Sequence, residues 1–498
     1  MKGMSLLKKL AGETAIYGIG SILSRLLHWV ILTPYFTRIF LQGEYGVVQE
    51  FYTYAALLMV LFTYRMETAF FRFGSKEEGF ERPFSTASLS LQISTILLVT
   101  VFLLFSQPLA DWLQYPDHRE YVIWFTFIIA FDALAAIPFA RLRLENRPIR
   151  FAALKTLNIL INILFIFLFL EVVPWLIERG WNGLEVIYND ANRINYVFLS
   201  NMIASLCILL LLLPAYAHIR LVFDRGLWRE MIYYAFPLVV AGLAAVVNQL
   251  IGNPMLKFLA SDDIEENLKQ VGIFGAAAKL AVIMNLFTTA FNYAAEPFFF
   301  RHAARDDAQT IYAQVGQAFA LVGSLVFLGI VLYIDLIQYF LGRDFREGLG
   351  IVPILLLANL CLGLYYNFSI WFKLTDRTRF GGYIAVAGAA ITIGLNFLLI
   401  PRLGYFGPAW AALACYGFMA LASYATGQHY YPIYYPMGRM LTYIALAIGG
   451  YFLSQLGRSW LDGQLAPTLL LNTGILLLYL LLLLWIERRQ LQQLLRRR

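Results

Sequence analysis

Long runs of apolar residues, each about 20 residues in length and separated by short polar segments, fill almost the whole chain. A helix of that length crosses the hydrocarbon core of a bilayer. Runs bounded by charges, proline or glycine therefore predict an all-α polytopic membrane protein with fourteen transmembrane helices. Their expected limits are 14–40, 47–71, 84–105, 121–140, 151–170, 194–214, 231–252, 271–300, 311–340, 349–372, 381–400, 405–426, 440–456 and 466–486.

The composition excludes several other classes of protein. Of the 498 residues 60% are hydrophobic and only 14% are charged, which is about half the charged share of a soluble domain. So little charge cannot coat a soluble protein of this size, and a soluble enzyme is excluded. An outer-membrane barrel is excluded too, because its strands alternate with period two. The net charge of +7 does not indicate nucleic-acid binding, since in a membrane protein the placement of positive residues matters more than their sum. No metal site or resident cofactor is expected.

The distribution of Lys and Arg predicts the orientation. With the N-terminus in the cytoplasm, 24 of the 38 basic residues fall on the cytoplasmic side and nine on the outer side. This asymmetry favours a bacterial inner-membrane protein with both termini in the cytoplasm. The remaining five basic residues lie inside expected helices, where charges usually face a cavity or a partner. These five residues are Arg25, Arg38, Arg65, Lys155 and Lys279.

A weak internal repeat divides the chain. The segment that begins at Tyr45-Gly46 has its equivalent at Val271-Gly272, six expected helices later. An even number of helices gives both halves the same orientation, and parallel repeats of this kind occur in transporters with the substrate site between the halves. We therefore expect a six-helix lobe over 1–220, a second over 221–437, and two further helices with a basic tail over 438–498.

Several short motifs occur in a characteristic order along the chain. They are Leu23-Ser24-Arg25, Pro34 with Thr37-Arg38, Glu44-Tyr45-Gly46, residues 66–73, Phe274 to Leu280 with Phe291 and Pro297, and Gly404 to Ala411. In their order and spacing these motifs resemble the polysaccharide-biosynthesis or O-antigen flippases of the multidrug/oligosaccharidyl-lipid/polysaccharide exporter superfamily. The resemblance is densest in the first 75 residues and thinnest after 440. Asn253-Pro254 departs from it, because many relatives carry Asp-Arg there.

The resemblance implies a flippase for a polyprenyl-pyrophosphate-linked oligosaccharide, which moves the sugar from the cytoplasmic to the outer leaflet for cell-surface polysaccharide biosynthesis. It also implies a V-shaped, alternating-access arrangement of the two lobes. The last two helices match by count the extra pair of the peptidoglycan-precursor flippases. Coupling to a proton or sodium gradient and contact with a polysaccharide polymerase would fit the same family.

Arg25 is the first candidate for binding the pyrophosphate. It lies near the middle of the first expected helix, on one face with Ser21 and His28. Arg can hold phosphate oxygens with two parallel hydrogen bonds, which gives basic residues at depth a function. The alternative for Arg25 is a salt bridge to Asp132. For His28 a packing histidine is an equal alternative to a proton-coupling one.

The other buried cations allow two readings each. Lys279 stands among small residues about 12 Å below the outer end of its helix and either faces a cavity or pairs with another helix. Arg65 and Lys155 lie near helix ends, where the side chain can reach the interface. Arg38 either guides release of the substrate or anchors the outer end of its helix. Asp132, the deepest acid, is either the partner of a deep cation or a site for a coupling ion.

Two competing functions stay open. A cation-coupled multidrug exporter of the same superfamily would line its cavity with acids and aromatics. In this chain most of the charged residues deep inside the expected helices are basic. A membrane-embedded, polyprenyl-dependent glycosyltransferase or polymerase would need acid–base residues on a substantial outer loop, and the expected loops are short. The sequence favours a transporter and not an enzyme, with a lipid-linked oligosaccharide as its partner.

Overall fold

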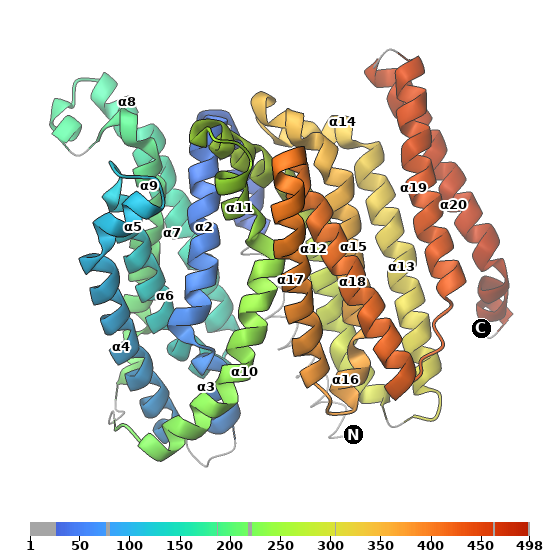
Figure 1. Cartoon of the computed structure of the whole chain (residues 1–498), viewed down its shortest axis with the longest axis horizontal. Coiled ribbons are helices and arrows are strands. Elements are labelled where there is room, and N and C mark those ends of the chain that lie inside the picture. The colour runs from blue at the N-terminus through green and yellow to red at the C-terminus, as the bar shows by residue number, and fades with distance from the viewer. Residues whose placement is uncertain are drawn as a thin grey trace. The chain divides into compact units, whose positions relative to one another are not determined.

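The computed structural model describes residues 26–75, 80–186, 188–217, 222–303, 305–461 and 464–496, with side chains of the last segment to residue 488. This part of the chain is helical and contains no strand (Figure 1). Thirteen helical segments in it are long and apolar enough to cross a membrane. Each overlaps one of the expected helices from the second onward, so the all-α prediction is confirmed. Of the first expected helix, residues 26–39 are described and are helical.

Contacts divide the chain into two compact units, which we call unit 1 and unit 2. Unit 1 contains the chain to Leu32 and Val47–Val247, and unit 2 contains Thr33–Gly46 and Asn248–Arg498. The first described helix and α2 therefore each contribute residues to both units. The lobe limits expected from the sequence remain a prediction.

The helices of unit 1 run from α2 to α10. Met66, Phe70, Phe84, Ile137 and Met231 form a buried core between α3, α4, α6 and α10. The bounds are α2 (Gln42–Thr63), α3 (Met66–Gly74), α4 (Glu81–Leu104), α5 (Ser106–Trp112), α6 (Arg119–Leu144), α7 (Pro148–Phe167), α8 (Val173–Glu178), α9 (Arg193–Leu212) and α10 (Arg225–Leu250).

A break that the sequence did not predict separates α2 from α3. Tyr64 and Arg65 have positive φ angles of 34° and 56°, a conformation that non-glycine residues rarely adopt. The expected continuous helix over 47–71 is therefore wrong. The break also brings Glu67 within 3.8 Å of the Arg65 guanidinium, whereas an unbroken helix would have placed these two side chains on different faces.

Unit 2 contains the longest helices of the chain. Its helix α12 packs against α11, α13 and α15, and α15 packs closely against α18. The bounds are α11 (Gly252–Leu259), α12 (Ile264–His302), α13 (Ala308–Leu332), α14 (Ile334–Ile337), α15 (Val352–Phe368), α16 (Ile370–Leu374), α17 (Arg379–Leu403), α18 (Phe406–Tyr430), α19 (Met437–Trp460) and α20 (Leu465–Arg496).

The early segment Thr33–Gly46 is part of unit 2 because specific hydrogen bonds hold it there. The Gly342 N–H donates to Thr37 Oγ1 over 3.0 Å. Arg38 Nη2 donates to the Tyr339 carbonyl over 2.8 Å, and Tyr45 packs edge to face on Phe345 with ring centres 5.5 Å apart. The C-terminal part of the first helix and the start of α2 are thereby fixed to residues about 300 positions later.

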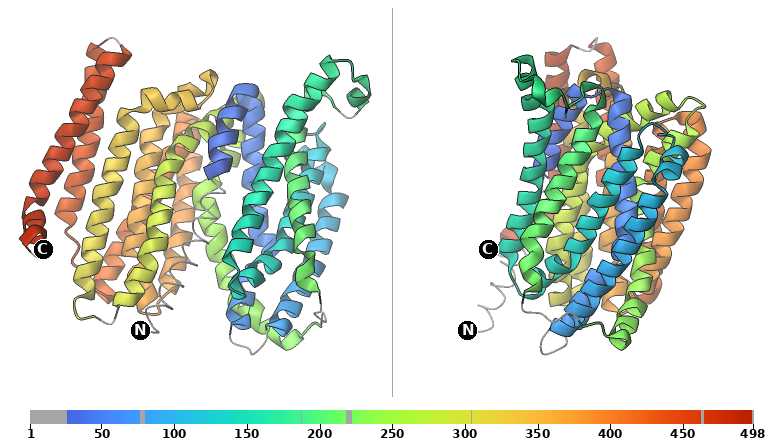
Figure 2. Two further views of the ribbon diagram at one scale, coloured as in Figure 1. Left: turned by 180° about the vertical axis from the view of Figure 1, so that it is seen from behind. Right: turned by 90° about the vertical axis from the view of Figure 1, so that its left-hand side faces the viewer.

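The last two helices, α19 and α20, lie side by side and dock on α13 (Figures 1 and 2). Buried hydrogen bonds join the three helices. Asn472 Nδ2 donates to the Leu332 carbonyl over 2.6 Å, and Ser454 Oγ donates to Asn472 Oδ1 over 2.6 Å. The Tyr479 hydroxyl donates to Ser324 Oγ over 2.8 Å. Polar contacts of this kind fix helix neighbours in lipid, where apolar surface alone gives little preference.

Candidate functional site

The centre of unit 1 contains a polar cluster around Asp132 of α6. Asp132 is half-buried, and its charge interacts with Lys155 of α7 and with Tyr52 of α2. Asn201 of α9 donates to the Tyr52 hydroxyl over 3.1 Å. Four helices of unit 1 thus contribute one polar side chain each to this cluster. Lys155 is an exposed residue whose ammonium group also lies 4.1 Å from the centre of the Phe139 ring.

Three candidate residues belong to the first expected helix: Arg25, His28 and Arg38. Arg25 lies outside the described residues. His28 is half-buried and belongs to unit 1. Arg38 belongs to unit 2 and donates to the carbonyls of Pro34 and Tyr339 over 2.6 and 2.8 Å. These bonds tie the Arg38 side chain to its own helix and to the segment that contains Tyr339.

Arg65 lies at the break between α2 and α3, close to the backbone of α10. A Cβ atom added to Gly242 would lie only 2.5 Å from Arg65 Nη2. The Arg65 side chain is 35% exposed and Glu67 is its ion-pair partner. The positive charge is therefore held at a position where two helices come close together, and the absence of a side chain at Gly242 makes room for it.

Lys279, the next candidate, belongs to unit 2. Lys279 is half-buried on α12 of unit 2, next to the buried residues Ala276 and Ala277. Further along the same helix lie Asn285 and Glu296. Asn285 Nδ2 is 3.5 Å from Asn359 Oδ1 on α15, and Lys373 Nζ donates to Glu296 Oε1 over 2.8 Å.

We call the polar residues on these facing helices the α12–α15 column. They follow α12 on one side and α15 with α16 on the other. The column consists of Asn285, Thr289, Tyr293 and Glu296, and of Asn359, Tyr366 and Lys373.

Sequence reasoning missed two buried charges. Glu50 of α2 is 0% exposed and accepts hydrogen bonds from the hydroxyls of Tyr54 and Tyr115 over 2.6 and 2.5 Å. An acid inside the expected helix 47–71 was a signal that could have identified it. Lys257 is also 0% exposed, although it lies between the expected helices 231–252 and 271–300. The short helix α11, which the sequence did not predict, buries it.

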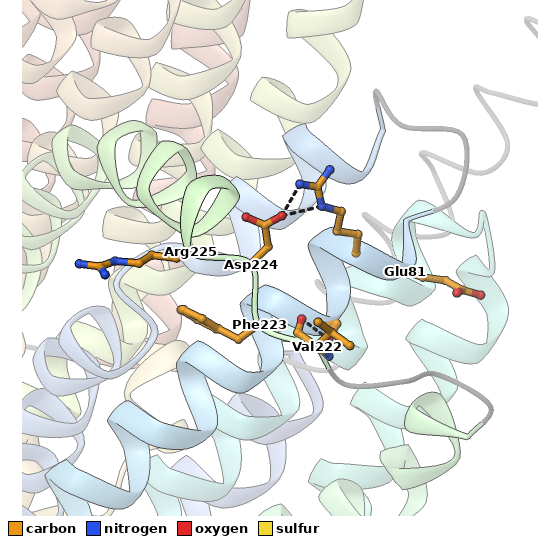
Figure 3. A pocket seen from close by; sticks show the side chains of 7 residues that line it. Glu81, Val222, Phe223, Asp224 and Arg225 are labelled. Carbon is orange, nitrogen blue, oxygen red and sulfur yellow. Dashed lines mark hydrogen bonds and ion pairs between the residues drawn. The ribbon is translucent and has the colours of Figure 1, made fainter.

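A pocket of about 510 Å³ lies at the start of α4 (Figure 3). Asp224 Oδ2 accepts a hydrogen bond from Arg82 Nε over 2.7 Å, and Asp224 Oδ1 accepts one from the Leu227 N–H over 2.9 Å. The bond from the Leu227 N–H and then the one from Arg82 lower the pKa of the Asp224 carboxyl. These contacts tie the start of α10 to α4. The pocket is lined by Glu81, Arg82, Ser85, Val222, Phe223, Asp224 and Arg225.

Among the residues that the structure describes, no three His, Cys, Asp or Glu side chains gather closely enough to hold a metal ion. The predicted candidates divide between the units. His28, Arg65, Asp132 and Lys155 belong to unit 1, and Arg38 and Lys279 belong to unit 2. Among the described candidates, Asp132 and Lys155 lie within electrostatic reach of each other.

Solved structures with the same fold are membrane transporters. The lipid II flippase MurJ in an inward closed conformation matches with a TM-score of 0.74 at 13% identity, over 96% of this chain and 100% of that one. An inward-facing multidrug resistance MATE family transporter of the MOP superfamily matches with a TM-score of 0.59 at 12% identity, over 80% and 97%. A mutant of the Vibrio cholerae MATE transporter VcmN matches with a TM-score of 0.58 at 14% identity, over 86% and 98%.

Sequence comparison assigns the family. No curated protein matches significantly. The model of the family described as polysaccharide biosynthesis protein matches residues 10–303, more than half of the chain. This match confirms the resemblance found in the motifs. The chain therefore belongs to the polysaccharide biosynthesis protein family, and it has the helical fold found in the lipid II flippase MurJ and in MATE transporters.

Proposed function

We propose that the protein is a flippase that moves a polyprenyl-pyrophosphate-linked oligosaccharide from the cytoplasmic to the outer leaflet of the bacterial inner membrane. One observation carries this proposal. The match with the lipid II flippase covers 96% of the chain, whereas the two MATE transporters cover 80% and 86%. The family assignment to polysaccharide biosynthesis points to a sugar-bearing lipid as the substrate.

The charges at membrane depth support an anionic substrate. A pyrophosphate carries two or three negative charges, and fixed cations lower the cost of moving it through a medium of low dielectric constant. Lys279 is a half-buried cation on α12 of unit 2. In our proposal Arg25 is a second cation, on the first helix, that binds the pyrophosphate. Asp132 and Lys155 interact with each other in unit 1.

A cation-coupled multidrug exporter is the second candidate, because the MATE transporters share the fold. The half-buried Asp132 is the feature that favours it, since an acid at depth can bind a coupling proton or sodium ion. The two candidates differ in the leaflet distribution of lipid-linked sugars, which only the first one changes.

Deletion of the gene in its host tests the proposal. We expect surface polysaccharide to be lost and its lipid-linked precursor to accumulate with the sugar on the cytoplasmic side. Plasmid-borne wild-type protein should restore both. Unchanged polysaccharide together with increased sensitivity to cationic dyes would instead identify a drug exporter. Conversion of the precursor into a new covalent product by the purified protein would identify an enzyme.

A further inference from the structure

The α12–α15 column is a continuous polar face inside unit 2. At 3.6 residues per turn, Asn285, Thr289, Tyr293 and Glu296 fall within an arc of about 80° on α12 and extend over about 17 Å along its axis. Asn359 and Tyr366 are seven residues apart and share one face of α15, and Lys373 follows at the same interval on α16. Contacts between Asn285 and Asn359 and between Glu296 and Lys373 align the two faces.

The exposure of this column indicates that it faces water. Tyr293 is 47% exposed, and Asn285, Thr289 and Asn359 are half-buried. Polar groups at membrane depth are costly against lipid. The outward face of α19 in the same unit is instead apolar, with Leu441, Phe452 and Leu456 all more than half exposed. The two faces therefore meet different surroundings.

The chemistry of the column fits a neutral ligand with many hydroxyl groups. Its two charged residues, Glu296 and Lys373, pair with each other over 2.8 Å. The column residues from Asn285 to Tyr293 are uncharged. The Asn285–Asn359 and Thr289–Asn285 hydrogen bonds are both 3.5 Å long and hence weak. The Asn285 amide can exchange these bonds for ones to a ligand, to which it can both donate and accept. Asn359 Nδ2 donates to the Leu355 carbonyl over 2.9 Å, so Asn359 offers chiefly its oxygen as an acceptor.

Aromatic rings complete this arrangement. The exposed ring of Tyr293 and the half-buried ring of Tyr366 lie between the amides and the ion pair along the helices. The apolar face of a sugar ring packs on such a ring while its hydroxyls bond to neighbouring polar groups. Lys279 stands six residues before Asn285, about 9 Å along the axis, and so lies beyond the neutral part.

We infer that the α12–α15 column binds the neutral saccharide head of the lipid-linked substrate. Asn285 and Asn359 bond to sugar hydroxyls, and Tyr293 packs on a sugar ring. The column thereby distinguishes a glycosylated lipid from the bare carrier, whereas the pyrophosphate is bound elsewhere by cations. This inference rests on the proposed function and adds to it a site for the sugar.

Binding of two lipid probes tests the inference. The full-length protein in nanodiscs is titrated with polyprenyl-pyrophosphoryl-N-acetylglucosamine and with polyprenyl pyrophosphate, and the Kd of each is measured by thermophoresis. In the Asn285→Ala/Tyr293→Ala variant we expect the Kd for the sugar-bearing lipid to rise at least fivefold and that for the bare lipid to stay within twofold. Tyr293→Phe keeps the ring and should stay within twofold for both.

Gln314→Ala is the matched control, because it removes an exposed amide from α13 of the same unit and should leave both values unchanged. An equal loss for both lipids, or no loss for the sugar-bearing lipid in a variant of normal thermal stability, would overturn the assignment of the sugar site. A wild-type protein that binds neither lipid would instead contradict the proposed function itself.

Discussion

Gly46 of α2 and Gly272 of α12 pack backbone against backbone in unit 2. A Cβ atom on Gly46 would lie 2.1 Å from the Leu268 carbonyl oxygen, and one on Gly272 would lie 1.9 Å from the Gln42 carbonyl oxygen. Small residues permit such close helix crossings in membranes. The two glycines therefore allow α2 and α12 to cross at backbone contact.

Alanine at either glycine should destabilise the protein, because the clashing atoms are backbone oxygens and cannot turn away. We expect Gly46→Ala and Gly272→Ala each to cost about 1–3 kcal/mol and to lower the amount of protein in the membrane severalfold. Thermal unfolding in detergent and membrane abundance measure this. Gly394→Ala is the control, since a Cβ there meets nothing within 4 Å. Equal stability of all three variants would contradict the close packing.

The partner of Asp132 can be identified by double-mutant cycles. Because its charge interacts with Lys155, Asp132→Asn and Lys155→Met should be coupled by at least about 0.5 kcal/mol in unfolding free energy. Asp132→Asn and Arg25→Met should be additive if Arg25 binds the pyrophosphate. In that case Arg25→Ala abolishes polysaccharide export at normal abundance, and Arg25→Lys retains part of it. If Asp132 is instead coupled only to Arg25, and export recovers in the Asp132/Arg25 double variant, then Arg25 forms a structural salt bridge with Asp132.

The start of α10 should respond to acid through Asp224. The Leu227 N–H and Arg82 lower the pKa of this carboxyl below its ordinary value of 3.8, so the folded state favours the ionised form. The stabilisation is complete above the ordinary value and is lost as the pH falls through the lowered pKa. Proteolysis of the connection before α10 should therefore be unchanged between pH 7 and 5 and increase only in stronger acid.

The control for this acid response is Asp224→Asn, which keeps an acceptor for the Leu227 N–H but loses the ion pair with Arg82. In this variant the rate of cleavage before α10 should no longer increase in stronger acid. A wild-type connection that opens already between pH 7 and 5 would show that another group governs it.

Asn472 should hold α20 to α13. It is 1% exposed and bonds to the Leu332 carbonyl and to Ser454. We expect Asn472→Leu to cost about 0.6–1.7 kcal/mol, the range measured for such bonds in membranes, and to lower the yield of a disulfide engineered between α13 and α20. Leu477→Ala, at a side chain that is 56% exposed, should leave the yield unchanged. An unaltered yield in Asn472→Leu would mean that apolar packing alone docks the pair.

The helices could be predicted because a bilayer imposes the same length on every apolar run. Breaks inside them could not, because residues 62–65 contain no glycine or proline to signal the left-handed turn at Tyr64 and Arg65. Helix α11 and its buried Lys257 were missed for another reason, because a helix of 8 residues is too short to appear as an apolar run that crosses a bilayer. Candidate charges at depth were found from sequence, but their partners depend on packing. Nothing in the sequence linked Asn285 to Asn359, 74 residues later.

The membership of Thr33–Gly46 in unit 2 sets an order for the synthesis of the protein. Arg38 bonds to a carbonyl 301 residues later, and Gln42 to one 302 residues later. At about 5–20 residues per second, the ribosome needs roughly 15–60 s to supply those partners. During that interval Arg38 and Gln42 lack these hydrogen-bond partners. A nascent chain that stops after residue 247 would therefore expose this segment to quality control, so that assembly of the N-terminal part is completed only when the second half arrives.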